Sequence, residues 1–242
     1  MTELQATRGA KMMYLIRRRP EASREELVAH WFANHMPLVI DSQLTQQSQG
    51  RVHAYRYIAT LFDADKSGNH PWDGVAQLWW DRALPETDQP FGDPPTDMFQ
   101  AKAQPYSGWA TSEYVVMDGE LASEPNPLNR AYPMTRSGFY KVTFLVAAQP
   151  GTDHDAFFTH WLEVHVPNVR RVMESVGGYR YVVSHSVNPR TAPYAGMAEL
   201  YFNNAQGWRD YVATIQPDGM EAWAADEGTL VLKSHTEMVG IP

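Results

Sequence analysis

The sequence predicts an α+β protein made of two copies of one unit, because three blocks of residues recur along the chain in the same order. The recurring blocks are residues 20–39 and 150–169, residues 55–58 and 179–182, and residues 74–80 and 196–202. The first pair is identical at six of twenty positions, and the offset between the copies falls from 130 to 124 and then to 122. A duplicated unit whose first copy has longer loops produces this pattern.

Each copy begins with a strand and continues into a helix. Residues 12–17 and 140–147 are apolar runs of the kind that form strands. A capping residue follows each strand, and in the first copy Ser23 with the glutamate three residues later forms a capping box. Each helix is expected to end before the proline of its block, Pro37 or Pro167.

The remaining elements complete the same order in both copies. A second strand carries the Tyr-Arg-Tyr block, and a third carries the G-x-A-[QE]-L block. A second helix is predicted over residues 205–215, whereas four prolines between residues 85 and 95 break or remodel that region of the first copy. The last strands are predicted at residues 112–117 and 230–239. Strand–helix–strand–strand–helix–strand is the ferredoxin-like, or split βαβ, order.

Two such repeats give two four-stranded antiparallel sheets, each covered by helices on one face. We expect the other faces to be apolar and to pack against each other, so that the fused repeats form a barrel within one chain. The predicted domains are residues 11–117 and 139–239. They are joined by a linker at residues 118–138 that has three prolines and no hydrophobic periodicity.

The composition excludes several classes of function. A net charge of −8 disfavours nucleic acid as a partner, and the absence of cysteine excludes disulfides, thiolate nucleophiles and cysteine-ligated metals. The most apolar run, residues 142–148, is too short to cross a membrane, and the first ten residues do not form a secretory signal. No metal-ligating spacing occurs, so we predict no metal site. We expect a cytoplasmic protein without a membrane or nucleic-acid partner.

One motif, H-W-x3-H-x-P, occurs in both copies. Its second histidine, His35 or His165, lies four residues after Trp31 or Trp161, and this spacing places imidazole and indole on one helix face toward the sheet. Such an imidazole can serve as a general acid or base, because its ordinary pKa is about 6.5. A structural histidine that caps the end of the helix is an equally weighted alternative.

The second and third strands supply the other candidate site residues. Alternation along the second strand groups one set of side chains on one face in each copy: His53, Tyr55 and Tyr57 in the first, and Tyr179, Tyr181 and His185 in the second. These side chains could bind a phenol or carbonyl, or stabilise an enolate; aromatic packing is the alternative. In the third strand Gln77 aligns with Glu199. A buried carboxylate there could shuttle protons, and an ion-paired structural carboxylate is the alternative.

The H-W-x3-H-x-P motif, followed by the G-x-A-[QE]-L-[WY]-[WF] strand, resembles the EthD family of the dimeric α/β barrel superfamily. The resemblance extends over both copies, so the chain looks like a tandem of two EthD-like units in which one polypeptide imitates the usual dimer. The resemblance implies no single reaction. Related barrels include cofactor-free monooxygenases, cyclases and isomerases and also haem proteins, so the fold limits function only loosely.

Three functions follow from these observations. The first is a cofactor-independent enzyme of lyase type that acts on an aromatic or polyketide-like small molecule, by decarboxylation, aldol or retro-aldol cleavage, or cyclisation, in a catabolic or secondary-metabolic pathway. The predicted catalytic residues are His35, His165, Glu199 and Tyr179. The predicted substrate-binding residues are Trp31, Trp161, Tyr55, Tyr57, Tyr181, Gln77, His53 and His185. The alternatives are a haem-binding tandem barrel and a non-catalytic binding protein. We expect a monomer with a pseudo-dimeric barrel, or a homodimer.

Overall fold

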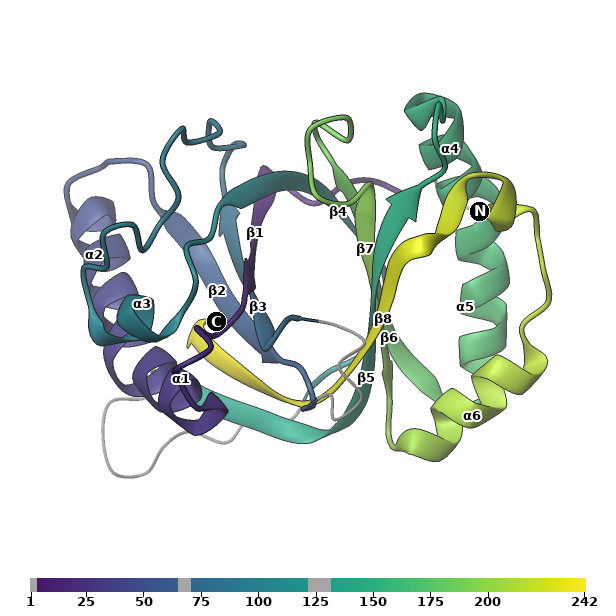
Figure 1. Ribbon diagram of the computed structural model, residues 1–242. Coiled ribbons are helices and arrows are strands. Elements are labelled where there is room, and N and C mark those ends of the chain that lie inside the picture. The colour runs from purple at the N-terminus through teal and green to yellow at the C-terminus, as the bar shows by residue number, and fades with distance from the viewer. Residues whose placement is uncertain (1–3, 65–70, 122–131) are drawn as a thin grey trace. The chain divides into compact units, whose positions relative to one another are not determined.

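The computed structural model describes residues 4–64, 71–121 and 132–242. Two stretches of the chain follow a similar order of elements, and the second has one additional short helix, η3, before its last strand (Figure 1). The first contains β1 (Ala10–Ile16), α1 (Arg24–His30), η1 (Trp31–His35), α2 (Met36–Ser48), β2 (Ala54–Leu61), β3 (Gly74–Trp80), α3 (Met98–Lys102) and β4 (Gly108–Asp118). The second contains β5 (Met134–Ala148), α4 (His154–His160), η2 (Trp161–His165), α5 (Val166–Ser175), β6 (Gly178–Ser186), β7 (Gly196–Phe202), α6 (Ala205–Thr214), η3 (Met220–Ala222) and β8 (Ala224–Ile241).

The described chain divides into two compact units that do not coincide with the sequence repeats. The C-terminal unit contains residues 4–7, 111–121 and 138–235, and the N-terminal unit contains residues 8–64, 71–110, 132–137 and 236–242. The predicted domain boundaries remain a prediction, and residues 122–131 of the predicted linker lie outside the described residues.

Each unit contains antiparallel strands and takes one strand segment from the other half of the chain. In the N-terminal unit β3 pairs with β1 and β2, and β2 pairs with the end of β8 (Figure 1). In the C-terminal unit β7 pairs with β5 and β6, and β6 pairs with β4. The described residues therefore form a mixed α/β fold with eight strands.

The helices of each unit cover one face of its strands. In the N-terminal unit Leu27, Trp31 and Met36 are buried in one hydrophobic core with Ile16 and Ala59. In the C-terminal unit helix residues such as Phe157 and Val169 are likewise buried with strand residues. The helices bury the face on which apolar side chains recur at helical spacing. The strands bury the face on which apolar side chains occupy alternate positions.

The opposite strand face is a mixture of polar side chains and buried apolar ones such as Met13, Val75, Leu145 and Met197, so the expectation of an apolar face holds only in part. This face carries buried polar side chains at the alternate positions: Lys11, Thr60 and Gln77 in the N-terminal unit, and Lys141, Thr143, Ser184 and Glu199 in the C-terminal unit. Lys141 and Glu199 satisfy each other in an ion pair with an Nζ–Oε1 distance of 2.6 Å. Such burial is tolerated because the charges are paired.

The sequence predicts that the first helix of each repeat ends before its proline. In the structure this helix continues through the proline. Trp31–His35 and Trp161–His165 are π-helical turns, in which the Met36 N–H donates to the Trp31 carbonyl. Proline has no N–H and its ring crowds the carbonyl four residues earlier in an α-helix. The wider turn removes that conflict, so α2 and α5 begin with proline at their second position. No helix in the described part of the chain is both long and apolar enough to cross a membrane.

Candidate active site

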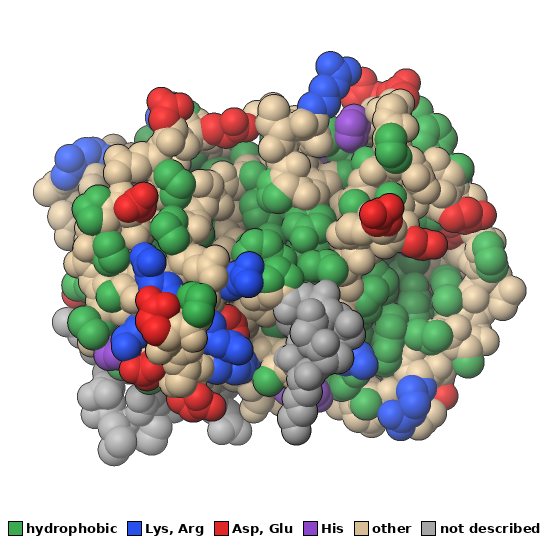
Figure 2. Space-filling model, viewed as in Figure 1, with side chains coloured by type: hydrophobic (Ala, Val, Ile, Leu, Met, Phe, Trp, Pro, Cys, Tyr) green, Lys and Arg blue, Asp and Glu red, His purple; other side chains and the backbone are tan. Residues whose placement is uncertain are grey.

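The C-terminal unit contains a cavity of about 430 Å³ between its helices and its strands. Apolar side chains form most of the wall, with Phe144 from β5, Tyr181 from β6, Leu200 from β7 and Tyr211 from α6. Figure 2 shows a hollow with hydrophobic side chains over this region, on the right of the view. A concave, mostly apolar site with few polar groups is the usual form of a small-molecule pocket.

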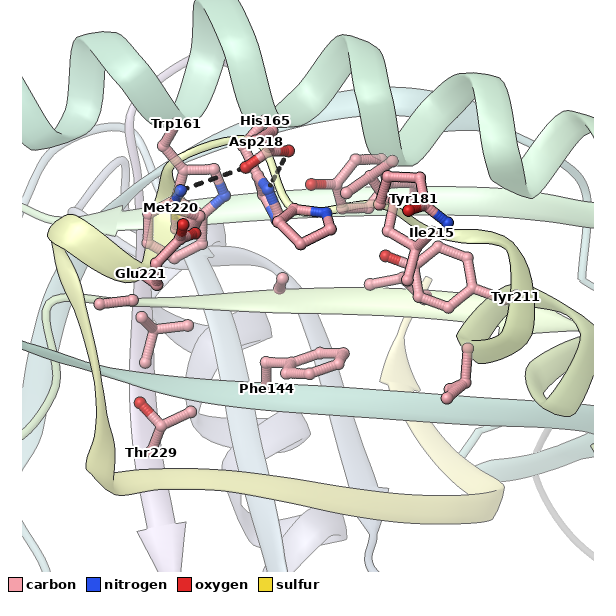
Figure 3. Close-up of a pocket in the computed structure, with 18 of the residues that line it drawn as sticks. Phe144, Trp161, His165, Tyr181, Tyr211, Ile215, Asp218, Met220, Glu221 and Thr229 are labelled. Carbon is pink, nitrogen blue, oxygen red and sulfur yellow. Dashed lines mark hydrogen bonds and ion pairs between the residues drawn. The ribbon is translucent and has the colours of Figure 1, made fainter.

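His165 and Asp218 are the polar pair of this cavity (Figure 3). The two residues come from η2 and from the segment before η3, and His165 Nδ1 lies 2.9 Å from Asp218 Oδ2. The carboxylate also accepts hydrogen bonds from Asn168 Nδ2 at 2.8 Å and from the Met220 backbone N–H at 3.2 Å. An acceptor held in this way fixes the proton of His165 on Nδ1, which leaves Nε2 as the ring nitrogen available to a ligand.

The surroundings of this pair set its protonation state. Burial lowers the pKa of His165 below its usual value, although the Asp218 carboxylate partly offsets this. Burial acts against ionisation of Asp218 as well, but hydrogen bonds from Asn168 and His165 hold the pKa of Asp218 below its usual value. At neutral pH the pair is thus a neutral imidazole and a carboxylate, and a neutral imidazole can accept a proton.

Two phenols and one indole are further hydrogen-bond donors at the cavity. Burial raises the pKa of Tyr181 and of Tyr211 above the usual value of tyrosine, so both remain hydrogen-bond donors. Trp161 is 1% exposed, and its Nε1–H is a further buried donor. Donors of this kind can stabilise negative charge on a ligand oxygen.

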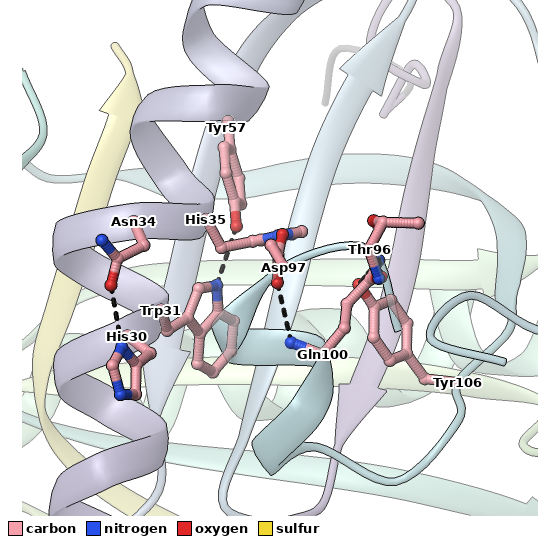
Figure 4. A network of polar contacts seen from close by, with 9 residues as sticks. All are labelled: His30, Trp31, Asn34, His35, Tyr57, Thr96, Asp97, Gln100 and Tyr106. Carbon is pink, nitrogen blue, oxygen red and sulfur yellow. Dashed lines mark hydrogen bonds and ion pairs between the residues drawn. The ribbon is translucent and has the colours of Figure 1, made fainter. Parts of the chain in front are cut away.

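The N-terminal unit contains a smaller cavity, of about 250 Å³, built in the same way. His35 Nδ1 lies 2.6 Å from Asp97 Oδ2, and Asp97 is the N-cap of α3 (Figure 4). The Trp31 Nε1–H donates to the Tyr57 hydroxyl at 2.8 Å. Each unit therefore holds a histidine–aspartate pair, a tryptophan and a strand tyrosine at a cavity.

The repeated motif explains this placement. Trp31 and His35 are four residues apart within one π-helical turn, and both line the N-terminal cavity. Trp161 and His165 do the same in the C-terminal cavity. Single π turns within helices often occur at functional sites, because they redirect side chains.

The structure brings together only part of the predicted set. The cavities contain six of the predicted residues: Trp31, His35, Tyr57, Trp161, His165 and Tyr181. Tyr55 and Tyr179 do not line these cavities, because the pairing of β2 and β6 with β3 and β7 shifts register at these residues. Such a β-bulge breaks the alternation on which the prediction depended. Tyr55 instead donates to the Arg8 carbonyl at 2.9 Å, and the Tyr179 ring lies 6.4 Å from that of Tyr201.

The other predicted residues also lie outside the two cavities. Gln77 and Glu199 are on the opposite strand face, since their neighbours Ala76, Leu78, Ala198 and Leu200 line the cavities. His53 Nδ1 contacts the Arg51 carbonyl at 3.0 Å. His185 is buried against Phe158, with ring centroids 4.2 Å apart, and burial lowers its pKa to about 3.

Sequence reasoning missed the two aspartates. Asp97 and Asp218 are 121 residues apart, which continues the falling offset of the repeat. Each begins the pattern D-x-x-[QE]-A, with Gln100 and Ala101 in the first copy and Glu221 and Ala222 in the second. This fourth repeated block was the available signal. Among the described residues, no three His, Asp or Glu side chains are grouped to hold a metal ion.

Comparisons with known proteins agree with this fold. The family model described as "EthD domain" matches residues 149–234, within the second repeat. No curated protein matches the chain. Among solved structures, an anthrone oxidase-like protein is 11% identical, with 97% of this chain and 96% of that chain covered and a TM-score of 0.57. A mutant form of the chlorite dismutase from Candidatus Nitrospira defluvii is 10% identical, with 94% and 91% covered and a TM-score of 0.50.

A haem-binding protein from Thermus thermophilus is also similar, at 10% identity, with 98% of this chain and 92% of that chain covered and a TM-score of 0.41. At these identities the likeness concerns the fold. The resemblance inferred from the two motifs is confirmed for the second repeat. Residues 149–234 match the EthD domain model, and the fold of the chain is similar to that of the anthrone oxidase-like protein.

Proposed function

We propose that the protein is an acid–base enzyme that acts on a neutral aromatic or polyketide-like ketone in the C-terminal cavity. The observation that carries this proposal is the His165–Asp218 pair, 2.9 Å apart, in a cavity with mostly apolar walls. An imidazole oriented by a carboxylate and kept neutral by burial is suited to proton transfer near neutral pH. Aromatic and aliphatic walls suit a planar, weakly polar ligand.

The chemistry begins with removal of a proton from a carbon that is either beside a carbonyl or conjugated with one through an aromatic ring. His165 Nε2 accepts the proton, the C–H electron pair moves into the carbonyl group, and an enolate forms. Tyr181 and Tyr211 both line the cavity and can donate to the enolate oxygen (Figure 3). His165 then returns the proton. Aldol cleavage and cyclisation, the lyase-type reactions expected from the sequence, pass through the same kind of enolate.

The charge of the cavity favours a neutral substrate. Asp218 and Glu221 are the acidic side chains that line it, and none of the described lining residues is Lys or Arg. An anionic ligand would find no cation to pair with and would meet negative charge. A neutral ketone has no such penalty.

Haem is the cofactor that the wider superfamily suggests, so we tested whether this cavity fits it. A histidine whose Nδ1 is held by a carboxylate is a common arrangement for a metal ligand. Haem, however, also carries two propionates, and the acidic lining without Lys or Arg supplies no partner for them. The residues of this cavity do not fit haem, and we derive no step through it.

Anthrone is a suitable probe of the proposal, because it is neutral, planar and carries an acidic CH2 conjugated with its carbonyl. Deuterium exchange at this CH2, followed by NMR in D2O under nitrogen, measures the proton-transfer step. The protein should accelerate exchange, and His165→Ala should reduce the acceleration about 100-fold or more. His30→Ala is the matched control, because His30 lines neither cavity and contacts Asn34 instead.

The outcomes separate the three candidate functions. Equal exchange with wild type and His165→Ala would remove the pair from the chemistry. Binding of anthrone without acceleration would identify a non-catalytic binding protein. A Soret shift on addition of haemin, lost in His165→Ala, would identify a haem protein.

We also propose that the two repeats form their barrel within a single chain. The pairing of β2 with β8 and of β6 with β4 supports this, because each joins strands from different repeats of one polypeptide. A mass near 27.4 kDa by light scattering would agree with a monomer, and twice that mass with a homodimer.

A further inference from the structure

The N-terminal cavity differs from the C-terminal one in ways that point to a different ligand. Seven of its fifteen lining residues are Phe, Tyr or Trp, against five of nineteen in the C-terminal cavity. Its volume is about 250 Å³, compared with about 430 Å³. A cavity of about 150 Å³ can hold benzene, and pockets for drug-sized ligands begin at about 300 Å³. The smaller cavity therefore fits one substituted aromatic ring.

Hydrogen-bond donors gather in this smaller cavity. The Tyr57 hydroxyl accepts the Trp31 Nε1–H at 2.8 Å, so its own O–H can donate to another acceptor. Tyr106 lines the same cavity, and Gln100 Nε2 approaches its hydroxyl at 3.5 Å (Figure 4). Trp80 also lines it, and its Nε1 is buried with no partner in the described part of the chain. An unpaired buried donor is costly unless a ligand or water satisfies it.

Tyr14 supplies a further hydroxyl at a position where the second repeat has none. It lies 130 residues before Phe144, which lines the C-terminal cavity. Its ring packs against Gly108, where an added Cβ would meet the ring at 2.4 Å. Burial raises the pKa of Tyr14 and of Tyr106 to about 12, so both phenols stay protonated donors at neutral pH.

We propose that the N-terminal cavity is a second, separate binding site, for a neutral single-ring aromatic carbonyl compound. The aromatic walls hold the ring, and the phenol and indole donors hydrogen-bond the carbonyl oxygen. No carboxylate or Lys or Arg side chain is among the described residues that line this cavity, which agrees with an uncharged ligand. This site is independent of the reaction proposed for the C-terminal cavity.

Acetophenone and α-methylstyrene are a matched pair of probes, because CH2 replaces the carbonyl oxygen and little else changes. Isothermal titration calorimetry with the full chain should show binding of acetophenone at this site, and the two variants below distinguish it from binding in the C-terminal cavity. Binding of α-methylstyrene should be about tenfold weaker, as expected for the loss of one or two hydrogen bonds. Equal affinity for the two compounds, or no binding of acetophenone, would overturn the proposal.

Two cavity-filling variants locate the site. Ala76 and Ala198 occupy equivalent strand positions, 122 residues apart, and each lines the cavity of its own unit. Ala76→Leu should abolish acetophenone binding, and Ala198→Leu should retain it. The reverse result, or the same result in both variants, would overturn the assignment of the site.

Tyr14→Phe tests the donor without altering the packing, since it removes one hydroxyl and reproduces the residue of the second repeat. We expect acetophenone affinity to fall about threefold to tenfold, and affinity for α-methylstyrene to stay the same. An unchanged acetophenone affinity in this variant would show that the carbonyl is not bound at Tyr14. If the wild-type protein did not accelerate deuterium exchange of anthrone, that result would contradict only the function proposed for the C-terminal cavity. It would leave the binding site proposed for the N-terminal cavity standing.

Discussion

The two cavities share a framework and differ in their linings. Each has a π-helical turn that presents Trp and His, and an aspartate that binds the histidine Nδ1. The C-terminal cavity is larger and has acidic side chains at its wall, whereas the N-terminal cavity is smaller and richer in aromatic rings. The framework provides the histidine–aspartate pair in both units, and on the functions proposed above the linings decide which ligand reaches it.

The largest expected effect is on proton transfer. His165→Ala should reduce anthrone exchange about 100-fold or more, because general acid–base catalysis contributes about that much. The loss should exceed that in His35→Ala at least about tenfold, since the smaller N-terminal cavity does not fit three rings. Exchange rates of the two variants under identical conditions provide the measurement. Similar losses in both would mean that the cavities do not differ in ligand selection.

A second difference between the units is His185, whose counterpart 124 residues earlier is Leu61. Burial lowers the pKa of His185 to about 3, whereas an unfolded histidine titrates near 6.5. Between these values the unfolded state binds a proton that the folded state does not, so stability falls as the pH decreases from 6.5 toward 3. At pH 5 this one group should cost about 2 kcal/mol of the free energy of unfolding.

His185→Leu, which reproduces the first repeat, removes this dependence. Urea unfolding at pH 7.5 and at pH 5 measures it, and the variant should lose less stability than wild type between the two values. The comparison across pH cancels the loss of stacking on Phe158, which does not depend on pH. Parallel losses in both proteins would show that His185 is accessible to protons in the folded state.

Asp218→Asn tests the role of the aspartate in the histidine–aspartate pair. It should reduce the rate of anthrone exchange less than His165→Ala does. A neutral amide no longer favours the protonated imidazole, so burial lowers the pKa of His165 further. Since the neutral imidazole is the base, the rate rises with pH through this pKa, and the rise should move to lower pH in the variant. Above it the rate should be about tenfold lower, because the ring is less well oriented and less basic. The measurement is a pH–rate profile of anthrone exchange for wild type and for the variant. An unshifted profile would mean that a group other than His165 controls the pH dependence of the rate.

Much of the framework was predictable because it follows regular periodicities. The alternation of strands and helices and the pairing of Trp with His at a spacing of four depend on local pattern, and both agree with the structure. Asp97 and Asp218 were harder to find, because they lie between regular elements and are recognised only through a short repeated block. Their role depends on a contact between residues 62 and 53 positions apart.

Several predicted site residues lie outside the cavities because contacts between separate strands determine where they point. Alternation along β2 and β6 predicts the faces of Tyr55 and Tyr179 only if the ladder is regular, and a one-residue bulge breaks it. For Glu199 the sequence predicts either a proton shuttle or an ion-paired structural carboxylate, and its ion pair with Lys141, on the strand face away from the cavity, agrees with the second. Partners from separate strands determine such positions, and no local pattern contains them.

The smallest expected effect tests whether proline maintains the π turn. Pro167 is the second residue of α5, where an N–H would otherwise be able to donate to a carbonyl of the preceding turn. Pro167→Ala restores that donor, which favours an ordinary α-helical turn and displaces His165 from Asp218. We expect anthrone exchange to fall about threefold to tenfold while the fold is retained, since a small displacement of a catalytic group lowers the rate. Pro37→Ala is the matched control, because the same change in the other unit leaves the His165–Asp218 pair in place. A loss of the same size in both variants would mean that the prolines act through stability alone.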